Sequence, residues 1–296
     1  MGEEKAKKIL VTGKESYIGT SFEKWLQQWP DDYVVDTVDM IGDEWRNKSF
    51  KGYDVVFHVA GIAHVSTNPK LESLYYKVNR DLAVETAEKA KNDGVKQFIF
   101  MSSIIVYGDS SILNQKRIID RSTIPQPSNF YGDSKLQAEN RIKLLECNGF
   151  KIVILRPPMI YGEGSKGNYQ KLAKAVRKLP VFPDIENQRS MLHIDNLCEF
   201  IRLIIKNEER GVFFPQNSEY AKTSELAKFI AEVHGKKIRL TKVFNPMLTI
   251  LGNYVHLVNK VFGNLVYEQS VSEYKENYRI RDLYGSIELT ELGIRK

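Results

Sequence analysis

Short apolar runs alternate with longer stretches of helical character through the first half of this chain. Three of these runs, KKILVTG (7–13), DVVFHVAG (54–61) and KQFIFMSS (96–103), contain three or four consecutive apolar residues in their centres. A strand with no polar side is typical of a parallel sheet that helices cover on both faces. The pattern therefore predicts an α/β fold with a doubly wound parallel sheet.

The same alternation of apolar runs and helical stretches predicts the other strands and helices and the division into domains. Further strands are expected at YVVDTVD (33–39) and KIVILRP (151–157). Helices are expected after the first strand through Trp29, over 71–93 and from about Tyr131. After Pro157 glycines and prolines interrupt the chain, and the last residues are helical in character. We expect a Rossmann domain at 1–165, to which residues of about 190–210 return, and a smaller, mostly helical substrate-binding lobe at 166–296.

Composition narrows the class of protein. The chain has 296 residues, of which 42% are apolar and 27% charged, as in an ordinary globular protein. Its net charge of +6 is spread along the sequence, which argues against nucleic-acid binding and suits a small anionic substrate. Cys147 and Cys198 lack metal-ligand spacing, so no metal site and no disulfide are expected. The charged N-terminus runs directly into the first strand without a signal peptide, and we expect a cytoplasmic protein.

Residues 243–267 are rich in apolar side chains. Asn, Pro, Gly, His and Lys interrupt them, whereas a membrane-spanning helix needs about 20 predominantly apolar residues. The segment therefore predicts one or two amphipathic helices that cover a lobe or pack on a partner, and no transmembrane segment.

The stretch VTGKESYIG (11–19) joins the first strand to the first helix. A glycine turn at this place lets a pyrophosphate approach the backbone N–H groups and the positive dipole end of the helix. The spacing here is Gly13-x-x-Ser16-x-x-Gly19, with serine at the middle position that is usually glycine. Taken alone, the turn could also be an ordinary strand-to-helix connection.

An acidic residue at the end of the second strand supports a dinucleotide. Asp39 lies 20 residues after Gly19, where a carboxylate can accept both ribose hydroxyls and repel a 2′-phosphate. This favours NAD over NADP. Asp36, earlier in the same strand, is the alternative acidic residue.

Two further stretches, FIFMSSIIVYGD and NFYGDSKLQAE, contain candidate catalytic residues. Tyr131 and Lys135 are four residues apart on an expected helix and share one face, so that the ammonium can lower the pKa of the phenol. Ser103 ends a strand that should lie beside the start of that helix. The three residues are typical of a site that interconverts an alcohol and a carbonyl.

Taken together, these stretches resemble the extended short-chain dehydrogenases/reductases, in the group of sugar-nucleotide epimerases, dehydratases and 4-ketoreductases. The resemblance covers nearly the whole chain and rests on VTGKESYIG, DVVFHVAG, KVNRDLAVETAEKA, FIFMSSIIVYGD, YGDSK, ILRPPMIYGEG and RSMLHIDNL. It implies NAD as cofactor and catalytic roles for Ser103, Tyr131 and Lys135. The cofactor-binding positions that it implies are Gly13, Ser16, Tyr17, Ile18, Gly19, Asp39, Ala60, Gly61, Asn79, Tyr131, Lys135 and Pro158.

The resemblance also implies substrate contacts. Arg189 falls where the group contacts the diphosphate of a nucleotide sugar, and Ser103 holds the reacting oxygen. His64, in AGIAHVS, is similar to a histidine of bacterial 4-ketoreductases that act on UDP-linked 4-keto sugars.

The implied activity is hydride transfer at C4 of a UDP- or dTDP-hexose. A 4-epimerase and a 4-ketoreductase would use the same three catalytic residues, so both remain open. Ile104 and Ile105 stand where dehydratases of the group tend to carry an acid pair, which disfavours a dehydratase. The expected binding partner is a nucleotide-sugar substrate, and the sequence is compatible with a homodimer. The alternative function comes from another class of protein: a dinucleotide-binding regulator that has the same fold but catalyses no reaction.

Overall fold

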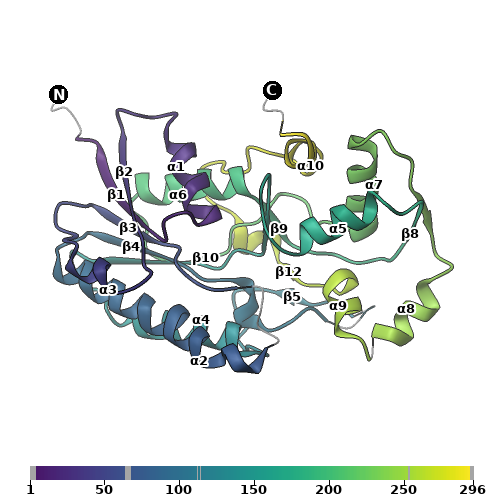
Figure 1. Cartoon of the computed structure of the whole chain (residues 1–296), viewed down its shortest axis with the longest axis horizontal. Coiled ribbons are helices and arrows are strands. Elements are labelled where there is room, and N and C mark those ends of the chain that lie inside the picture. The colour runs from purple at the N-terminus through teal and green to yellow at the C-terminus, as the bar shows by residue number, and fades with distance from the viewer. Residues whose placement is uncertain (1–4, 64–67, 112, 114, 253, 294–296) are drawn as a thin grey trace. The chain divides into compact units, whose positions relative to one another are not determined.

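Six parallel strands form one sheet in the computed structural model of this chain (Figure 1). The structure describes residues 5–63, 68–111, 113, 115–252 and 254–293. Within them the strand order is β10-β6-β4-β3-β1-β2. The strands are β1 (Lys7–Thr12), β2 (Tyr33–Val38), β3 (Val55–His58), β4 (Gln97–Met101), β6 (Lys151–Leu155) and β10 (Gly211–Phe213).

The strand order has a switch point at β1. The chain goes from β1 to β2 on one side and then to β3 on the other side of β1. The carboxyl ends of these strands coincide, because Thr12 is in register with both Val38 and His58. In open α/β sheets, a crevice for ligands forms outside the carboxyl ends at such a point. The fold therefore places the segments after β1, β2 and β3 at one edge.

Helices cover both faces of the sheet (Figure 1). On one face lie α1 (Tyr17–Leu26) and α6 (Ile194–Lys206), and the ring of Phe22 in α1 meets Phe57 of β3 edge to face at 5.3 Å. On the other face lie α3 (Leu82–Asn92) and α4 (Phe130–Lys143). Their small and aliphatic side chains, among them Ala83, Ala87 and Ala138, pack in one core cluster with Phe98 and Phe100 of β4. Small residues let these helices approach the sheet closely.

Contacts along the chain cluster into two compact units. Unit 1 comprises Met1–Gly108, Pro125–Pro157 and Cys198–Phe214, and unit 2 comprises Asp109–Ile124, Pro158–Leu197 and Pro215–Lys296. Unit 1 holds the sheet. Its remaining elements are η1 (Glu44–Asn47), η2 (Pro69–Leu71), α2 (Glu72–Tyr75), the π-helical turn η3 (Tyr76–Asp81) and η4 (Ile104–Tyr107).

Unit 2 has its own hydrophobic cluster, which includes Tyr161, Tyr169, Met191 and Ile230. Paired strands in it are short: β7 with β9, β8 with β11, and β5 with β12. Its elements are β5 (Ile118–Ile119), β7 (Met159–Tyr161), α5 (Asn168–Val176), β8 (Val181–Pro183), β9 (Met191–His193), α7 (Thr223–Val233), β11 (Arg239–Thr241), α8 (Asn245–Gly252), α9 (His256–Phe262), β12 (Val266–Tyr267), η5 (Gln269–Ser272) and α10 (Leu283–Leu292).

The doubly wound parallel sheet expected from the sequence is confirmed, with differences in detail. The helix expected over 71–93 is divided by η3, and the first helix ends at Leu26 rather than Trp29. The short edge strand β10 has no counterpart among the expected elements. The apolar segment 243–267 forms two short helices, α8 and α9, as predicted. None of the helices that the structure describes is long and apolar enough to cross a membrane.

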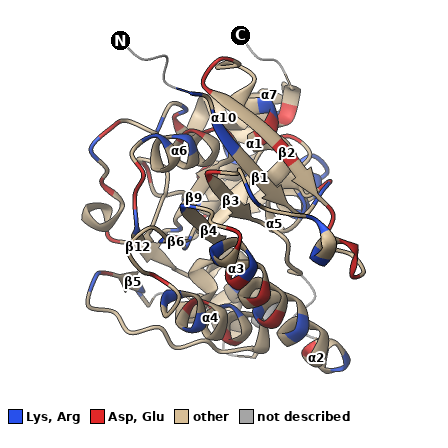
Figure 2. Cartoon of the chain, turned by 90° about the vertical axis from the view of Figure 1, so that its left-hand side faces the viewer, with Lys and Arg blue, Asp and Glu red and all other residues tan. Residues whose placement is uncertain are grey.

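Charges of both signs lie close together on the helices of unit 1. Figure 2 shows Lys and Arg mixed with Asp and Glu along α3 and α4. On α3, Glu85 and Glu88 are followed by Lys89 and Lys91. A mixed distribution of this kind is typical of a solvated helix face.

Candidate active site

The turn after β1 is built around two glycines. Gly13 has φ +92°, which favours glycine, and a Cβ there would lie 3.1 Å from the backbone of Ala60. Gly13 N–H donates to the carbonyl of Val38 at 2.9 Å. The turn is therefore pressed between the ends of β2 and β3, and any larger residue at position 13 would force the segments apart.

Ser16 has a local structural role that explains why it stands where glycine is usual. It is the N-cap of α1, and its hydroxyl accepts the N–H of Gly19 at 3.1 Å. A Cβ at Gly19 would come within 2.6 Å of that hydroxyl. Tyr17 and Ile18 form the first turn of α1, whose remaining N–H groups have no partner within the helix. This end of α1 can receive an anionic group.

Two carboxylates on β2 and just beyond it differ in their partners. Asp39 follows β2 directly, is exposed, and accepts the N–H of Ile41 at 3.0 Å. Asp36 accepts the hydroxyl of Tyr53 at 2.8 Å. Burial, together with Asp36, raises the pKa of Tyr53 to about 12. The carboxylate of Asp36 is thus occupied by the hydroxyl of Tyr53, whereas Asp39 lies at the carboxyl edge beside the glycine turn.

Asn79 holds the segment that follows β3. It lies buried in η3, its Oδ1 accepts the N–H of Ile62 at 2.9 Å, and its Nδ2 donates to the carbonyl of Ile62 at 3.0 Å. A Cβ at Gly61 would lie 3.0 Å from Asn79 Oδ1 and 3.3 Å from Lys135 Nζ. Gly61 therefore lets the side chains of Asn79 and Lys135 approach the loop after β3. Within an α-helix, π-helical turns are frequent at functional sites.

The side chains of Ser103 and Tyr131 lie close enough for the Ser103 hydroxyl to lower the pKa of the phenol, against the larger effect of burial. Ser103 lies just beyond β4 and caps η4, where its hydroxyl accepts the N–H of Ile105 at 3.3 Å. Tyr131 lies in the first turn of α4, and its ring packs edge to face on Tyr75 at 5.8 Å between centroids. The expected juxtaposition of the strand end and the helix start is present.

Gly132, beside Tyr131, makes this approach possible and was not singled out in the sequence. A Cβ at this position would lie 2.6 Å from the carbonyl oxygen of Ile105. The helix start can therefore pack against η4 only if residue 132 has no side chain. A glycine inside a helix costs about 1 kcal/mol relative to alanine, so its occurrence there is the signal that could have revealed the contact.

Lys135 lies one turn further along α4. It is buried, and its Nζ donates to the carbonyl of Met101 at 2.8 Å and lies 4.7 Å from the centre of the Phe100 ring. Burial lowers the pKa of Lys135 to about 8, and the carboxylate of Glu139 acts in the opposite direction. The ammonium is thus fixed at the end of β4, next to Gly61.

One expectation about these groups is corrected. The sequence suggested that Lys135 lowers the pKa of Tyr131, but burial raises the pKa of Tyr131 to about 12, and the hydroxyl of Ser103 only partly offsets it. The physical reason is that packing against neighbours such as Tyr75 shields the phenol of the half-buried Tyr131 from water, which disfavours the phenolate. A further positive charge at the site is needed before Tyr131 can act as a base near neutral pH.

Behind Lys135 lies a buried ion pair that the sequence did not reveal. Glu139 accepts from Arg156 Nη2 at 2.5 Å and from Nε at 3.0 Å, and Ser102 Oγ donates to the same carboxylate at 2.5 Å. Arg156 Nη1 donates to the hydroxyl of Tyr107 at 2.6 Å. The pair joins α4 to β6, to the residue before Ser103 and to η4. It therefore fixes the elements that carry Ser103 and Lys135.

Three further residues were expected at the site. His64 is outside the described residues. Pro158 comes three residues after β6 and is the first residue of its segment of unit 2. Arg189, also in unit 2, donates from Nη1 to the carbonyls of Lys260 at 2.8 Å and Gly263 at 3.2 Å. Burial lowers the pKa of Arg189 to about 10.

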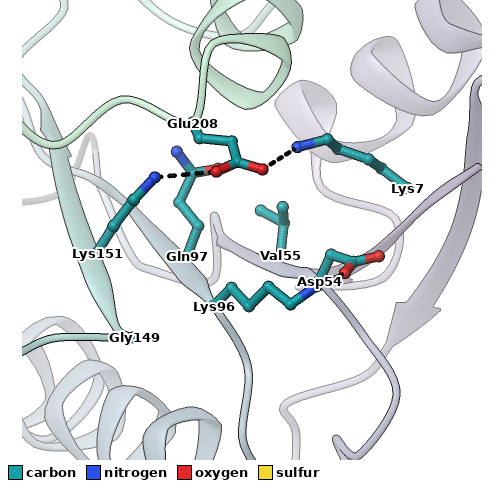
Figure 3. A pocket seen from close by; sticks show the side chains of 8 residues that line it. All are labelled: Lys7, Asp54, Val55, Lys96, Gln97, Gly149, Lys151 and Glu208. Carbon is teal, nitrogen blue, oxygen red and sulfur yellow. Dashed lines mark hydrogen bonds and ion pairs between the residues drawn. The ribbon is translucent and has the colours of Figure 1, made fainter. Parts of the chain in front are cut away.

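A pocket lies at the opposite edge of the sheet, where the strands begin (Figure 3). Lys7, Val55, Gln97 and Lys151 line it from the starts of four strands. Its charges pair with one another: Glu208 accepts from Lys7 at 2.8 Å and from Lys151 at 3.0 Å (Figure 3). Because ligands of such sheets bind outside the carboxyl ends, this pocket is not the candidate active site.

The sequence profile of the NAD dependent epimerase/dehydratase family matches residues 9–214. The chain belongs to this family. The matched range includes the glycine turn, Asp39, Asn79 and the Ser103, Tyr131 and Lys135 cluster. Family membership makes the chain a relative of enzymes that work with a nicotinamide dinucleotide, and the arrangement at the carboxyl edge fits such a cofactor.

Relatives in this family include sugar 4-epimerases. UDP-glucose 4-epimerase of Vibrio cholerae is 31% identical over 249 residues, which cover 76% of this chain and 75% of that protein. N-acetyl-alpha-D-glucosaminyl-diphospho-ditrans,octacis-undecaprenol 4-epimerase of Escherichia coli O157:H7 is 27% identical over 277 residues, covering 86% and 81%. The solved structure of UDP-glucuronic acid 4-epimerase from Bacillus cereus with NAD has a TM-score of 0.71 at 19% identity and covers 95% of this chain and 94% of that one. At this identity the structural likeness shows the shared fold.

Proposed function

We propose that this chain is a 4-epimerase that transfers hydride at C4 of a UDP-hexose. The observation that carries the proposal is the placement of Ser103 just beyond β4, near the phenol of Tyr131, with the buried ammonium of Lys135 one turn further along α4 and bound to the carbonyl of Met101. A hydroxyl pair next to a fixed positive charge suits proton exchange with a sugar hydroxyl. The similarity to UDP-glucose 4-epimerase of Vibrio cholerae supports the choice of reaction.

Tyr131 is proposed to take the proton of the C4 hydroxyl, while the hydroxyl of Ser103 donates to the C4 oxygen and orients it. The C4 hydrogen leaves as hydride as the carbonyl forms, and in the return step hydride reaches the opposite face while Tyr131 gives the proton back. When bound, the oxidised nicotinamide supplies the hydride acceptor and a positive charge that favours the phenolate of Tyr131. Lys135 adds a second positive charge, fixed by its bond to Met101.

The cofactor is proposed to be NAD, held by groups at the carboxyl edge. The N–H groups at the start of α1 suit its pyrophosphate, and the exposed carboxylate of Asp39 suits the two ribose hydroxyls. A 2′-phosphate would meet the negative charge of Asp39. Asn79 and Gly61 shape the loop after β3 that leads to the catalytic residues.

Arg189 is proposed to bind the diphosphate of the substrate. Among the residues that the structure describes, none of the ion pairs includes Arg189, which is half-buried and whose pKa burial lowers. A partly buried charge without a counter-ion is unfavourable, and a diphosphate would supply the missing negative charge. The two carbonyls bound to Nη1 orient the guanidinium.

A second candidate function is the same epimerisation at C4, with the sugar attached to a lipid diphosphate instead of UDP. The Escherichia coli relative is named for a sugar on an undecaprenol diphosphate, and its match covers 86% of this chain. A lipid-linked sugar offers the same diphosphate to Arg189 and the same C4 hydroxyl to Tyr131. Supplying the sugar on each carrier in turn separates the two candidates.

The proposal is tested by incubating the purified chain and NAD with UDP-glucose and UDP-N-acetylglucosamine and identifying products by NMR. The expected product is the 4-epimer, and Tyr131→Phe should lower turnover by about 10²–10⁴-fold while NAD still binds. Consumption of NADH with a 4-keto sugar, without epimerisation, would identify a 4-ketoreductase. NAD binding without turnover on any of these sugars would identify the non-catalytic regulator.

A further inference from the structure

Helix α8 of unit 2 carries apolar side chains on its outer side. Met247 and Ile250 are 53% and 62% exposed, and Leu251 is exposed as well. Their spacing of three and four residues puts them on one face of the helix. The flanking residues extend this surface, because Val243 is 80% and Tyr254 is 84% exposed. We call Val243, Phe244, Met247, Ile250, Leu251, Tyr254 and Val255 the α8 surface.

The α8 surface is held outward by contacts on the other side of the helix. Leu248 packs against the core cluster of unit 2, and the backbone approaches closely at the buried Gly252. Asn259 of α9 donates to the carbonyl of Gly252 at 2.6 Å, and Asn245 donates to the carbonyl of Asp184 at 2.8 Å (Figure 1 shows α8 next to α9). The inner side of α8 is therefore already packed, and its outer apolar side is additional to the core.

The chain segment that carries the α8 surface has basic residues and no acidic ones, although Asp184 of a neighbouring segment lies near Lys242. Residues 233–267 contain no Asp or Glu, although Asp and Glu number 37 among the 296 residues of the chain. The same segment contains five basic residues, all exposed: Lys236, Lys237, Arg239, Lys242 and Lys260. Apolar side chains bordered by Lys and Arg, without acidic residues, are typical of segments that lie on anionic membranes.

We propose that the α8 surface docks this protein on the surface of an anionic lipid membrane. The apolar side chains of α8 would enter the boundary between headgroups and acyl chains, with Tyr254 at the headgroup level, where aromatic rings with a polar end are enriched. The basic residues would lie over the anionic headgroups. This inference concerns where the protein binds and holds for either carrier of the sugar.

A second copy of the chain suits this surface less well than lipid does. In a symmetric dimer the same patch occurs on both sides of the contact. Lys242, which adjoins Val243, would then approach the Lys242 of the other copy, and like charges across an interface oppose association. Anionic headgroups complement the surface.

The test is flotation of the full chain with vesicles of phosphatidylcholine, with and without phosphatidylglycerol, at low and high salt. Wild type should float with the anionic vesicles at low salt and be released by high salt. The double variant Met247→Asp with Ile250→Asp should bind at least about tenfold less, because it places two charges in the apolar boundary. Leu144→Asp, at a still more exposed apolar residue after α4 in unit 1, is the control and should bind as wild type.

Three results would overturn the proposal. The first is wild type that stays with the bulk solution, and the second is a double variant that floats as well as wild type. The third is self-association of wild type that the double variant abolishes, without flotation of either, which would assign the α8 surface to a dimer. Circular dichroism checks that each variant is folded. Because no turnover is measured, failure here is distinct from failure of the proposed epimerase activity.

Discussion

Arg156 and Glu139 form a buried ion pair one helical turn beyond Lys135, with Arg156 Nη2 at 2.5 Å from the carboxylate. Both residues are almost wholly inaccessible, at 5% and 0% exposure. Removing one partner leaves a buried charge without compensation, which typically costs about 3–5 kcal/mol. The pair joins the helix of Tyr131 and Lys135 to the strand next to β4.

Glu139→Gln should therefore lower the free energy of unfolding by about 3 kcal/mol or more. Glu232→Gln is the matched control, since it removes the exposed pair with Lys228 on α7 and should cost less than about 1 kcal/mol. Urea unfolding followed by circular dichroism measures both. Similar losses for the two variants would contradict a special role for the buried pair.

Asp39→Ala should weaken NAD binding and reduce the preference for NAD over NADP. The reason is that the variant loses both the acceptor for the ribose hydroxyls and the charge that repels a 2′-phosphate. Fluorescence titration with each cofactor gives the ratio of dissociation constants. Asp36→Ala is the control and should leave this ratio unchanged, because Asp36 is bonded to Tyr53. If only Asp36→Ala changes the ratio, the assignment of Asp39 is wrong.

Arg189→Lys should raise the KM for the UDP-sugar and leave NAD affinity nearly unchanged. Lysine keeps the charge but cannot offer a planar pair of donors to two phosphate oxygens. Steady-state kinetics and a cofactor titration are the measurements. An unaltered KM would exclude the diphosphate role, and an equal loss of NAD affinity would show that Arg189 acts through the fold.

His58 should make the fold sensitive to acid. Its Nδ1 lies 2.8 Å from Thr12 Oγ1, and burial lowers the pKa of His58 from 6.5 to about 3. The unfolded chain binds a proton at this residue as pH falls below 6.5, while the native chain does not. This contribution to stability is therefore full above pH 6.5 and is lost as pH falls toward 3.

The measurement is the free energy of unfolding by urea at about pH 7.5 and about pH 5 for wild type and His58→Asn. Asparagine keeps a polar atom near the position of Nδ1 but does not titrate. Wild type should lose about 2 kcal/mol more than the variant over this interval. Equal losses would mean that His58 accepts a proton in the native state.

The fold was predictable from the sequence because its strands are buried on both faces. β3 and β4 are buried at every residue, and all of these residues except His58 and Gln97 are apolar. β10 was not predicted because it has only three residues, Gly211–Phe213, which is too short for a sequence pattern. It is a strand because it pairs with β6. The division of the helix over 71–93 was not predictable either, since the π-helical turn around Asn79 accompanies a bond to a distant backbone segment.

The candidate site was predictable where the order of motifs determines position. Ser103 at the end of a strand and Tyr131 at the start of a helix are brought together by the parallel topology. The pKa of Tyr131 was not predictable, because burial depends on neighbours such as Tyr75 that are far apart in sequence. The partner of Glu139 was hidden for the same reason: Arg156 follows β6, and no spacing within α4 reveals it.

Hydride transfer at C4 is tested most directly with a UDP-hexose that carries deuterium at C4. The purified chain is incubated with this substrate and NAD in ordinary water, and the 4-epimer is analysed by NMR. If the account is right, the product keeps deuterium at C4, because the same hydride leaves and returns. A product with hydrogen from solvent at C4, or no 4-epimer at all, would contradict it.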